Sequence, residues 1–138
     1  MLARIGLAMA AVVLVAACTR TYYKEFVVEP QDRAYQARAQ FDDVRSYLRS
    51  RGLRTVIETN NFLEVEVEPG NTLRVRLTPQ PKVELTLVRV TKESDFTEAE
   101  VRRFQETFAG RFREQTGQPV TIRLVDQRVS PVINIGPQ

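Results

Sequence analysis

Histidine is absent from this chain of 138 residues, and cysteine occurs once, as Cys18. Without an imidazole, the chain lacks the usual general base, the usual nitrogen ligand of a metal and the usual partner of a nucleophilic serine. Zinc or copper would have to be held by carboxylates alone, which suit Ca²⁺ or Mg²⁺ better. The sequence has no D-x-D-x-D-G calcium loop, and its six glycines are scattered rather than gathered in a phosphate-binding loop. We therefore expect no catalytic residue, no metal site and no cofactor.

Lysine is scarce, because seventeen of the twenty basic residues are arginine. Arginine could serve to bind phosphate or lipid headgroups, but a GC-rich genome is the simpler explanation. The seventeen acidic residues are interspersed with the bases, and the formal net charge is only +3. Since no basic stripe is formed, we expect the chain not to bind nucleic acid.

The first eighteen residues have the pattern of an export signal. Arg4 is the only charge before an uncharged, apolar run over residues 5–17. That run is too short to cross a membrane, which takes about 20 apolar residues. A basic start, a short apolar run and small residues before a cleavage point are typical of a secretory signal peptide. We therefore predict that residues 1–17 are removed and that the mature chain begins at Cys18.

The tetrapeptide Val15-Ala16-Ala17-Cys18 resembles the lipobox of bacterial lipoproteins, with Val15 where leucine is usual. The resemblance covers residues 1–18 and no part of the domain that follows. It implies that Cys18 is acylated and becomes the N-terminus, which would anchor the protein to a membrane and leave it facing the periplasm. Thr19 stands where an aspartate marks inner-membrane retention in enterobacterial lipoproteins, so the resemblance implies the outer membrane, with the inner membrane as the alternative. An ordinary signal peptide or an uncleaved anchor with a chance cysteine is the less favoured reading of this segment.

The most regular part of the sequence is residues 53–90, where four alternating runs are separated by turn residues and predict a four-strand antiparallel meander. A three-residue loop at Pro69-Gly70-Asn71 would place Glu64 opposite Arg76 and Glu66 opposite Arg74. A second loop at Pro79-Gln80-Pro81 would place Arg76 opposite Glu84. These pairs could form a charged binding surface or an acid–base pair. Cross-strand ion pairs on a wet face are the favoured interpretation, because an arginine neighbour keeps the pKa of a carboxyl low.

The flanking segments complete the fold prediction. Residues 32–51 and 97–116 have helical periodicity, the second with a Thr97/Glu100 capping box, and residues 119–125 alternate like a strand. We predict an α+β fold, a two-layer sandwich whose mainly antiparallel sheet, a four-strand meander plus one or two edge strands, carries two helices on one face. The predicted boundaries are a signal peptide at 1–17, an acylated cysteine with an N-terminal tether or edge strand at 18–30, an α+β domain at 31–126 and a C-terminal tail at 127–138.

Two apolar features are candidates for contacts. Phe104, Phe108 and Phe112 line one stripe of the second helix, and such a stripe is more often core than a ligand pocket. The tail carries Val132, Ile133 and Ile135, which is unusually apolar for a chain end and could pair with a partner.

These observations lead us to expect a non-catalytic, lipid-anchored accessory or scaffolding subunit of a cell-envelope complex, bound to the membrane through Cys18 and to an envelope protein. The alternative is a binder or carrier of an amphipathic envelope ligand, a lipid or a glycan, which would need a pocket beside the phenylalanine helix. An enzyme acting through paired carboxylates is the least favoured class.

Overall fold

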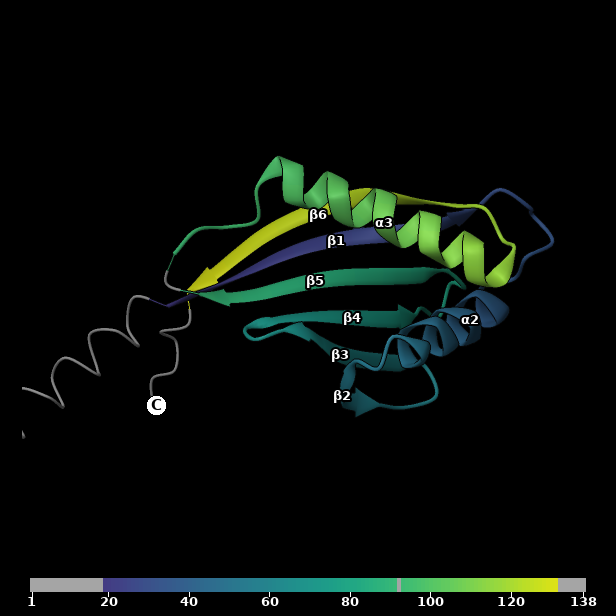
Figure 1. The fold of residues 1–138 in the computed structure, drawn as a ribbon, viewed down its shortest axis with the longest axis horizontal. Helices are drawn as coiled ribbons and strands as arrows, with labels where there is room; N and C mark the ends of the chain where they lie inside the picture. The colour runs from purple at the N-terminus through teal and green to yellow at the C-terminus, as the bar shows by residue number, and fades with distance from the viewer. Residues whose placement is uncertain (1–18, 92, 132–138) are drawn as a thin grey trace, which may run out of the picture.

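The computed structural model describes residues 19–91 and 93–131, which form one six-stranded antiparallel sheet with two helices on one face (Figure 1). The predicted signal peptide, Cys18 and the apolar residues Val132, Ile133 and Ile135 lie outside this described part. The elements in chain order are β1 (Arg20–Pro30), α2 (Ala37–Ser50), β2 (Arg54–Glu58), β3 (Phe62–Glu68), β4 (Asn71–Leu77), β5 (Val83–Thr91), α3 (Glu98–Thr116) and β6 (Val120–Pro131). The strand order across the sheet is β2-β3-β4-β5-β1-β6.

The predicted α+β sandwich is confirmed. Helix α3 packs over β6, and α2 packs over β4 and β5 (Figure 1). Between the layers lies one core, in which the phenylalanines Phe26, Phe41 and Phe112 are fully buried. In β3, β4 and β5 alternate residues point into this core because side chains alternate across a pleated sheet, whereas β2 at the sheet edge is exposed throughout. No helix within the described residues combines the length and the apolar character that crossing a bilayer requires.

The register of the β3–β4 hairpin differs from the prediction by two residues. Glu64 lies opposite Arg74 rather than Arg76, and Val65 opposite Leu73. The cause is a tighter turn, in which Gly70 adopts a positive φ of 84° and an irregularity between Glu66 and Glu68 absorbs one residue. A shift of two keeps every side chain on its predicted face, so the error left the core assignment intact. The predicted pairing of Arg76 with Glu84 is confirmed.

Strand β1 is not an edge strand, contrary to the prediction for residues 18–30. It lies between β5 and β6 and pairs antiparallel with both. The strand after α3 therefore runs parallel to β5, with β1 inserted between them. Strand β1 pairs along its whole length with β6 and from Arg20 to Val27 with β5, which satisfies backbone groups on both of its sides.

The C-terminal strand is longer than predicted, so residues 127–131 are part of the sheet and not of a tail. Strand β6 reaches Pro131, which lies opposite Arg20. Gln127 is itself exposed, but its side-chain oxygen accepts a 2.6 Å hydrogen bond from the buried ammonium of Lys24. Lys24 also donates to Asp95 at 2.8 Å, which ties the loop before α3 to the sheet.

The two helices differ in how well their starts were predicted. Helix α3 has the expected capping box between Thr97 and Glu100 and ends at Gly117, which has a φ of 75°. Helix α2 begins at Ala37, five residues later than expected, and Asp32 does not cap it. Instead the Asp32 carboxylate accepts from the backbone of Ala34 in a local turn, a frequent use of aspartate side chains.

Candidate functional site

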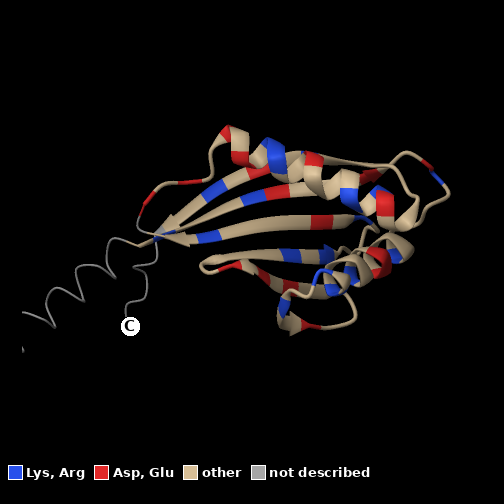
Figure 2. Cartoon of the chain, viewed as in Figure 1, with Lys and Arg blue, Asp and Glu red and all other residues tan. Residues whose placement is uncertain are grey.

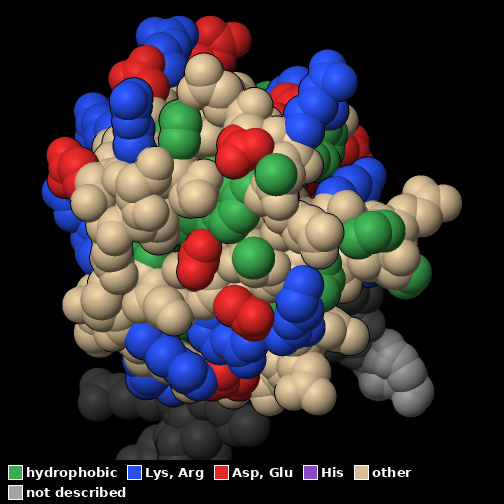
Figure 3. All heavy atoms as spheres, turned by 90° about the vertical axis from the view of Figure 1, so that its right-hand side faces the viewer, with side chains coloured by type: hydrophobic (Ala, Val, Ile, Leu, Met, Phe, Trp, Pro, Cys, Tyr) green, Lys and Arg blue, Asp and Glu red, His purple; other side chains and the backbone are tan. Residues whose placement is uncertain are grey.

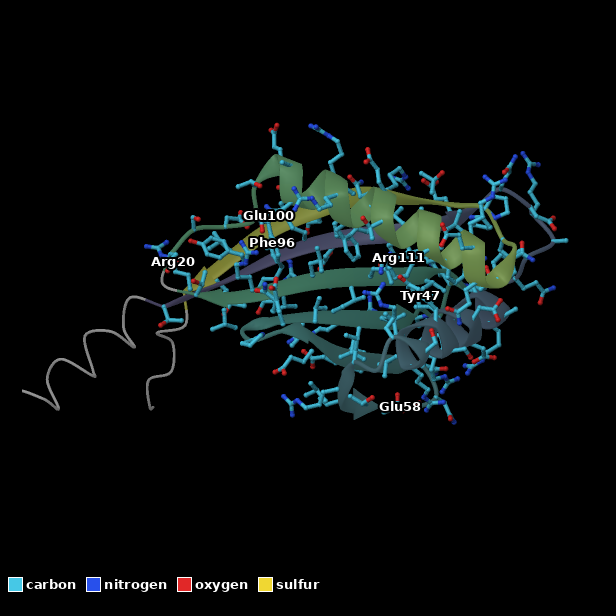
Figure 4. All side chains as sticks on the ribbon, viewed as in Figure 1. Arg20, Tyr47, Glu58, Phe96, Glu100 and Arg111 are labelled. Atoms are coloured by element: carbon cyan, nitrogen blue, oxygen red, sulfur yellow. The ribbon has the colours of Figure 1, made fainter. Side chains whose placement is uncertain are left out.

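A groove of about 330 Å³ lies between the two helices on the covered face of the sheet. Its origin is a mismatch of lengths, because α2 has 14 residues and spans about 21 Å whereas α3 has 19 and spans about 28 Å. The sheet beside the last turn of α2 is therefore left without a helix over it. Figure 4 shows Tyr47 of α2 between the two helices and, toward the other end of the sheet, Phe96 and Glu100 at the start of α3.

The surface inside the groove is mainly apolar. Leu73 of β4 and Leu87 of β5 form its floor, and Phe104 and Phe108 of α3 form one wall. Val67 of β3 lies at the mouth with 44% of its surface exposed, although it points to the same side of the sheet as the core. An apolar concavity with few polar groups is the usual form of a small-molecule site, and its volume falls at the lower end of the range of about 300–1,000 Å³.

A cluster of ion pairs and hydrogen bonds closes one end of the groove. The Arg89 guanidinium donates to the Glu100 carboxylate at 2.7 Å and to the Asn71 side chain at 3.2 Å, and it stacks on the Phe96 ring with 4.1 Å to the ring centre. Asn71 in turn donates to Glu68 at 2.7 Å. The hydrogen bond from Arg89, followed by that from the Thr97 backbone, lowers the pKa of Glu100 to about 2. Each charge at this end has a partner of its own.

Glu100 yields a pH-dependent prediction for the closed end. Its folded-state pKa of about 2 lies below the ordinary value of 4.5, so its contribution to stability is complete above pH 4.5 and is lost as the pH falls from 4.5 to about 2. Since its side chain is 39% exposed, solvent screening limits this contribution to about 1 kcal/mol. We expect Glu100→Gln, which preserves a capping side chain, to lower the free energy of unfolding by that amount at pH 7 and to match the wild type near pH 2.

Chemical denaturation across this pH range measures the effect. Glu98→Gln is the control, since Glu98 lies in the same first turn but on the exposed surface. A Glu100→Gln penalty that persisted unchanged at pH 2 would show that the charge of Glu100 is not its cause.

The opposite face of the sheet carries the ion pairs that were predicted as a ladder. Arg76 donates to Glu84 at 2.5 Å, as expected, but Glu64 pairs with Arg74 at 3.2 Å. Glu66 pairs with Arg54 at 3.0 Å rather than with Arg74. These carboxylates are therefore engaged with arginines, and the part of the chain that the structure describes holds no cluster of acidic residues suited to a metal ion.

Charge is distributed without segregation over the described surface. Figure 2 shows Lys and Arg alternating with Asp and Glu along both the strands and the helices. The end of the domain seen in Figure 3 has both signs interspersed with small apolar areas. The groove is thus the feature that differs most clearly from the rest of the surface.

The predicted phenylalanine stripe divides between core and groove. Phe112 is fully buried and Phe108 is 4% exposed, whereas Phe104 is only partly buried at the groove wall. Sequence reasoning missed Arg51, Val67 and Arg103, which also line the groove. The residue that could have indicated the groove is Gly52. It follows the end of α2, beyond which no helix lies over that part of the sheet.

A search against models of known protein families and against curated proteins finds no match to this chain.

Proposed function

We propose that this chain is a non-catalytic, lipid-anchored protein of the bacterial cell envelope that faces the periplasm and binds the apolar part of an amphipathic ligand. The observation that carries the proposal is the apolar groove between α2 and α3. This groove favours the carrier or binder that the sequence presented as the alternative to an accessory subunit. The outer membrane is the proposed location, because Thr19 rather than an aspartate follows Cys18.

The chemistry around the groove supports binding rather than catalysis. A general acid at neutral pH needs a raised carboxyl pKa, whereas the hydrogen bond from Arg89 lowers that of Glu100, the carboxyl at the closed end. On the helix side, hydrogen bonds from Arg49 and Arg38 likewise lower the pKa values of Glu58 and Asp42. The chain contains no histidine to act as a base instead.

The position of the anchor also supports a membrane-derived ligand. Strand β1 begins at Arg20, so only Thr19 separates it from Cys18, a reach of at most about 7 Å. Acylation of Cys18 would hold that end of the sheet against the bilayer. Figure 4 shows Arg20 at the same end of the molecule as Phe96 and Glu100, which line the groove. The groove would then lie near the bilayer, the source of an amphipathic molecule.

The proposal is tested by filling the groove from an exposed position. Thr107 of α3 lines the groove but is solvent-exposed, so Thr107→Trp can occupy the mouth without disturbing the core. We expect the acylated wild-type protein to co-purify with a lipid or glycolipid in gentle detergent, and Thr107→Trp to reduce the bound amount at least about tenfold because a filled pocket excludes the chain. Mass spectrometry of the extracted molecules measures the ratio to protein.

Glu106→Trp is the matched control, because Glu106 is exposed on the same helix and does not line the groove. Both variants should have the thermal stability of the wild type. An equal amount of bound lipid in all three proteins would contradict the groove as the binding site.

An accessory subunit remains the second candidate, and the edge strand β6 favours it. Val125 and Val129 on this strand are 42% and 52% exposed, and no further strand pairs with the outer side of β6 within the described residues. An unpaired edge can receive a strand from a partner. A stoichiometric protein partner that Thr107→Trp retains, in a sample free of bound lipid, would favour this function.

A further inference from the structure

Two arginines stand on opposite walls of the groove. Arg51 lies at the C-terminal end of α2, directly before Gly52, and Arg103 lies on α3 one turn after Glu100. Both are solvent-exposed, whereas the floor between them is formed by Leu73 and Leu87. Apolar surface and positive charge therefore meet at one concavity.

Neither arginine has an acidic partner in the described part of the chain. Among the described residues, the one polar contact of the Arg51 side chain is a long hydrogen bond of 3.5 Å to the Tyr47 hydroxyl, and Arg103 takes part in no ion pair. By contrast, Arg49 and Arg45, two and six residues before Arg51, share the carboxylate of Glu58. The two acidic residues of the groove, Glu68 and Glu100, are already engaged at its closed end by Asn71 and Arg89. The groove thus carries an excess of positive charge with hydrogen-bond donors unused.

We propose that the ligand of the groove is a single-chain amphipathic anion, whose chain lies on Leu73 and Leu87 and whose carboxylate or phosphate is held by Arg51 and Arg103. This inference rests on the proposed function and specifies its ligand. The volume of about 330 Å³ suits one short apolar chain rather than several. Guanidinium groups are well suited to carboxylate and phosphate because their N–H donors match the geometry of both.

The closed end of the groove sets the orientation of the ligand. There the Arg89 charge is neutralised by Glu100 and its donors are used, so this end offers an anion little attraction. The aromatic ring of Phe96, stacked on Arg89, presents an apolar surface to the groove instead. The end of the chain is therefore directed toward Phe96 and the headgroup toward the two free arginines.

Photo-crosslinking of the acylated full-length protein in phosphatidylcholine vesicles tests the inference. The probes are diazirine-bearing dodecanoate and dodecyl phosphate, with dodecanol and dodecyltrimethylammonium carrying the same chain without negative charge. Because all protein variants face the same vesicles, partition of a probe into the bilayer is equal among them. Peptide mapping should locate the crosslinks of the anionic probes on β4, β5 and α3.

The variant that tests the charge is Arg51→Gln with Arg103→Gln. Hydrogen bonds to a charged group are stronger than neutral ones, so loss of both arginines should reduce labelling by the anionic probes at least about tenfold. Labelling by dodecanol should stay at its lower, wild-type level. The control is Arg102→Gln with Arg113→Gln, which removes two arginines of α3 that are exposed and do not line the groove. High salt should weaken labelling of the wild type by the anions only.

The outcomes separate the inference from the proposed function. Preference for dodecanoate over dodecyl phosphate, or the reverse, supports the inference and identifies the headgroup. Equal groove labelling by dodecanol and the anions, unaffected by Arg51→Gln and Arg103→Gln, overturns the anion and leaves a groove for neutral chains. Stronger labelling by the cationic probe also overturns it. Absence of groove labelling by every probe, together with no effect of Thr107→Trp on bound lipid, overturns the proposed function itself.

Discussion

Cys18→Ala protein is expected to carry no covalently attached lipid, whereas the wild-type chain is expected to be fully acylated at its N-terminus. The wild type, extracted in detergent and digested with trypsin, should yield the peptide Cys18-Thr19-Arg20 bearing a thioether-linked diacylglycerol. The physical reason for more than one chain is that each buried CH₂ contributes about 0.8 kcal/mol, so a single chain gives only reversible membrane binding. Mass spectrometry of the N-terminal peptide measures the modification directly.

Thr19→Asp is the matched control for this experiment. The lipoprotein resemblance predicts that it leaves acylation of Cys18 unchanged and moves the protein to the inner membrane where the enterobacterial sorting rule applies. Separation of the two membranes on a density gradient measures the shift. An unmodified Cys18 in the extracted wild-type protein, or a chain still joined to residues 1–17, would contradict the lipoprotein assignment.

The elements whose signals are local were predicted well. The Thr97/Glu100 capping box and the left-handed Gly117 each depend on a few neighbouring residues, and both ends of α3 lie within one residue of the prediction. The meander depends on alternation, which survives in β3, β4 and β5 because each of these strands has one buried face, whereas β2 is exposed throughout. Even the wrong β3–β4 register kept the faces, since the bulge near Val67 and the tighter turn together moved the pairing by two residues.

The errors concern pairings that no local pattern encodes. In β6 the alternation runs through Ile122 and Leu124, and a bulge opposite Glu25 and Phe26 then shifts its phase so that Gln127 and Val129 face the helices. A phase change of this kind makes a strand look like an irregular tail in the sequence. Strand β1 is interior only because β6, about a hundred residues later in the chain, pairs with its outer side. Such a long-range pairing depends on the whole fold and not on a local pattern.

The groove was beyond prediction for a related reason. Phe104 and Phe112 occupy equivalent positions on the apolar stripe of α3, yet only Phe112 faces the covered part of the sheet. What separates them is the point at which α2 ends relative to β3 and β4. That point depends on how two helices of different length are placed on one sheet, and helical periodicity carries no information about it.

This difference between equivalent phenylalanines leads to the second large prediction. Phe112 is fully buried. Its ring stacks on that of Phe108 with 6.0 Å between ring centres and meets the ring of Tyr47 edge-on at 6.1 Å. We expect Phe112→Ala to lower the free energy of unfolding by about 3–5 kcal/mol, because the lost transfer energy is joined by the cost of a cavity that cannot collapse. Such a loss approaches the whole stability of many domains, about 5–15 kcal/mol.

Phe104→Ala removes the same atoms from a wall that already meets solvent, so water can fill the space and the expected loss is smaller, about 1–2 kcal/mol. Urea denaturation of both variants measures the two losses. If Phe104 belongs to a ligand site, Phe104→Ala should also change the amount of bound lipid while the protein stays folded. Equal losses for the two variants would mean that Phe104 is ordinary core and that the groove is closed in solution, since only a packed environment makes the two side chains equivalent.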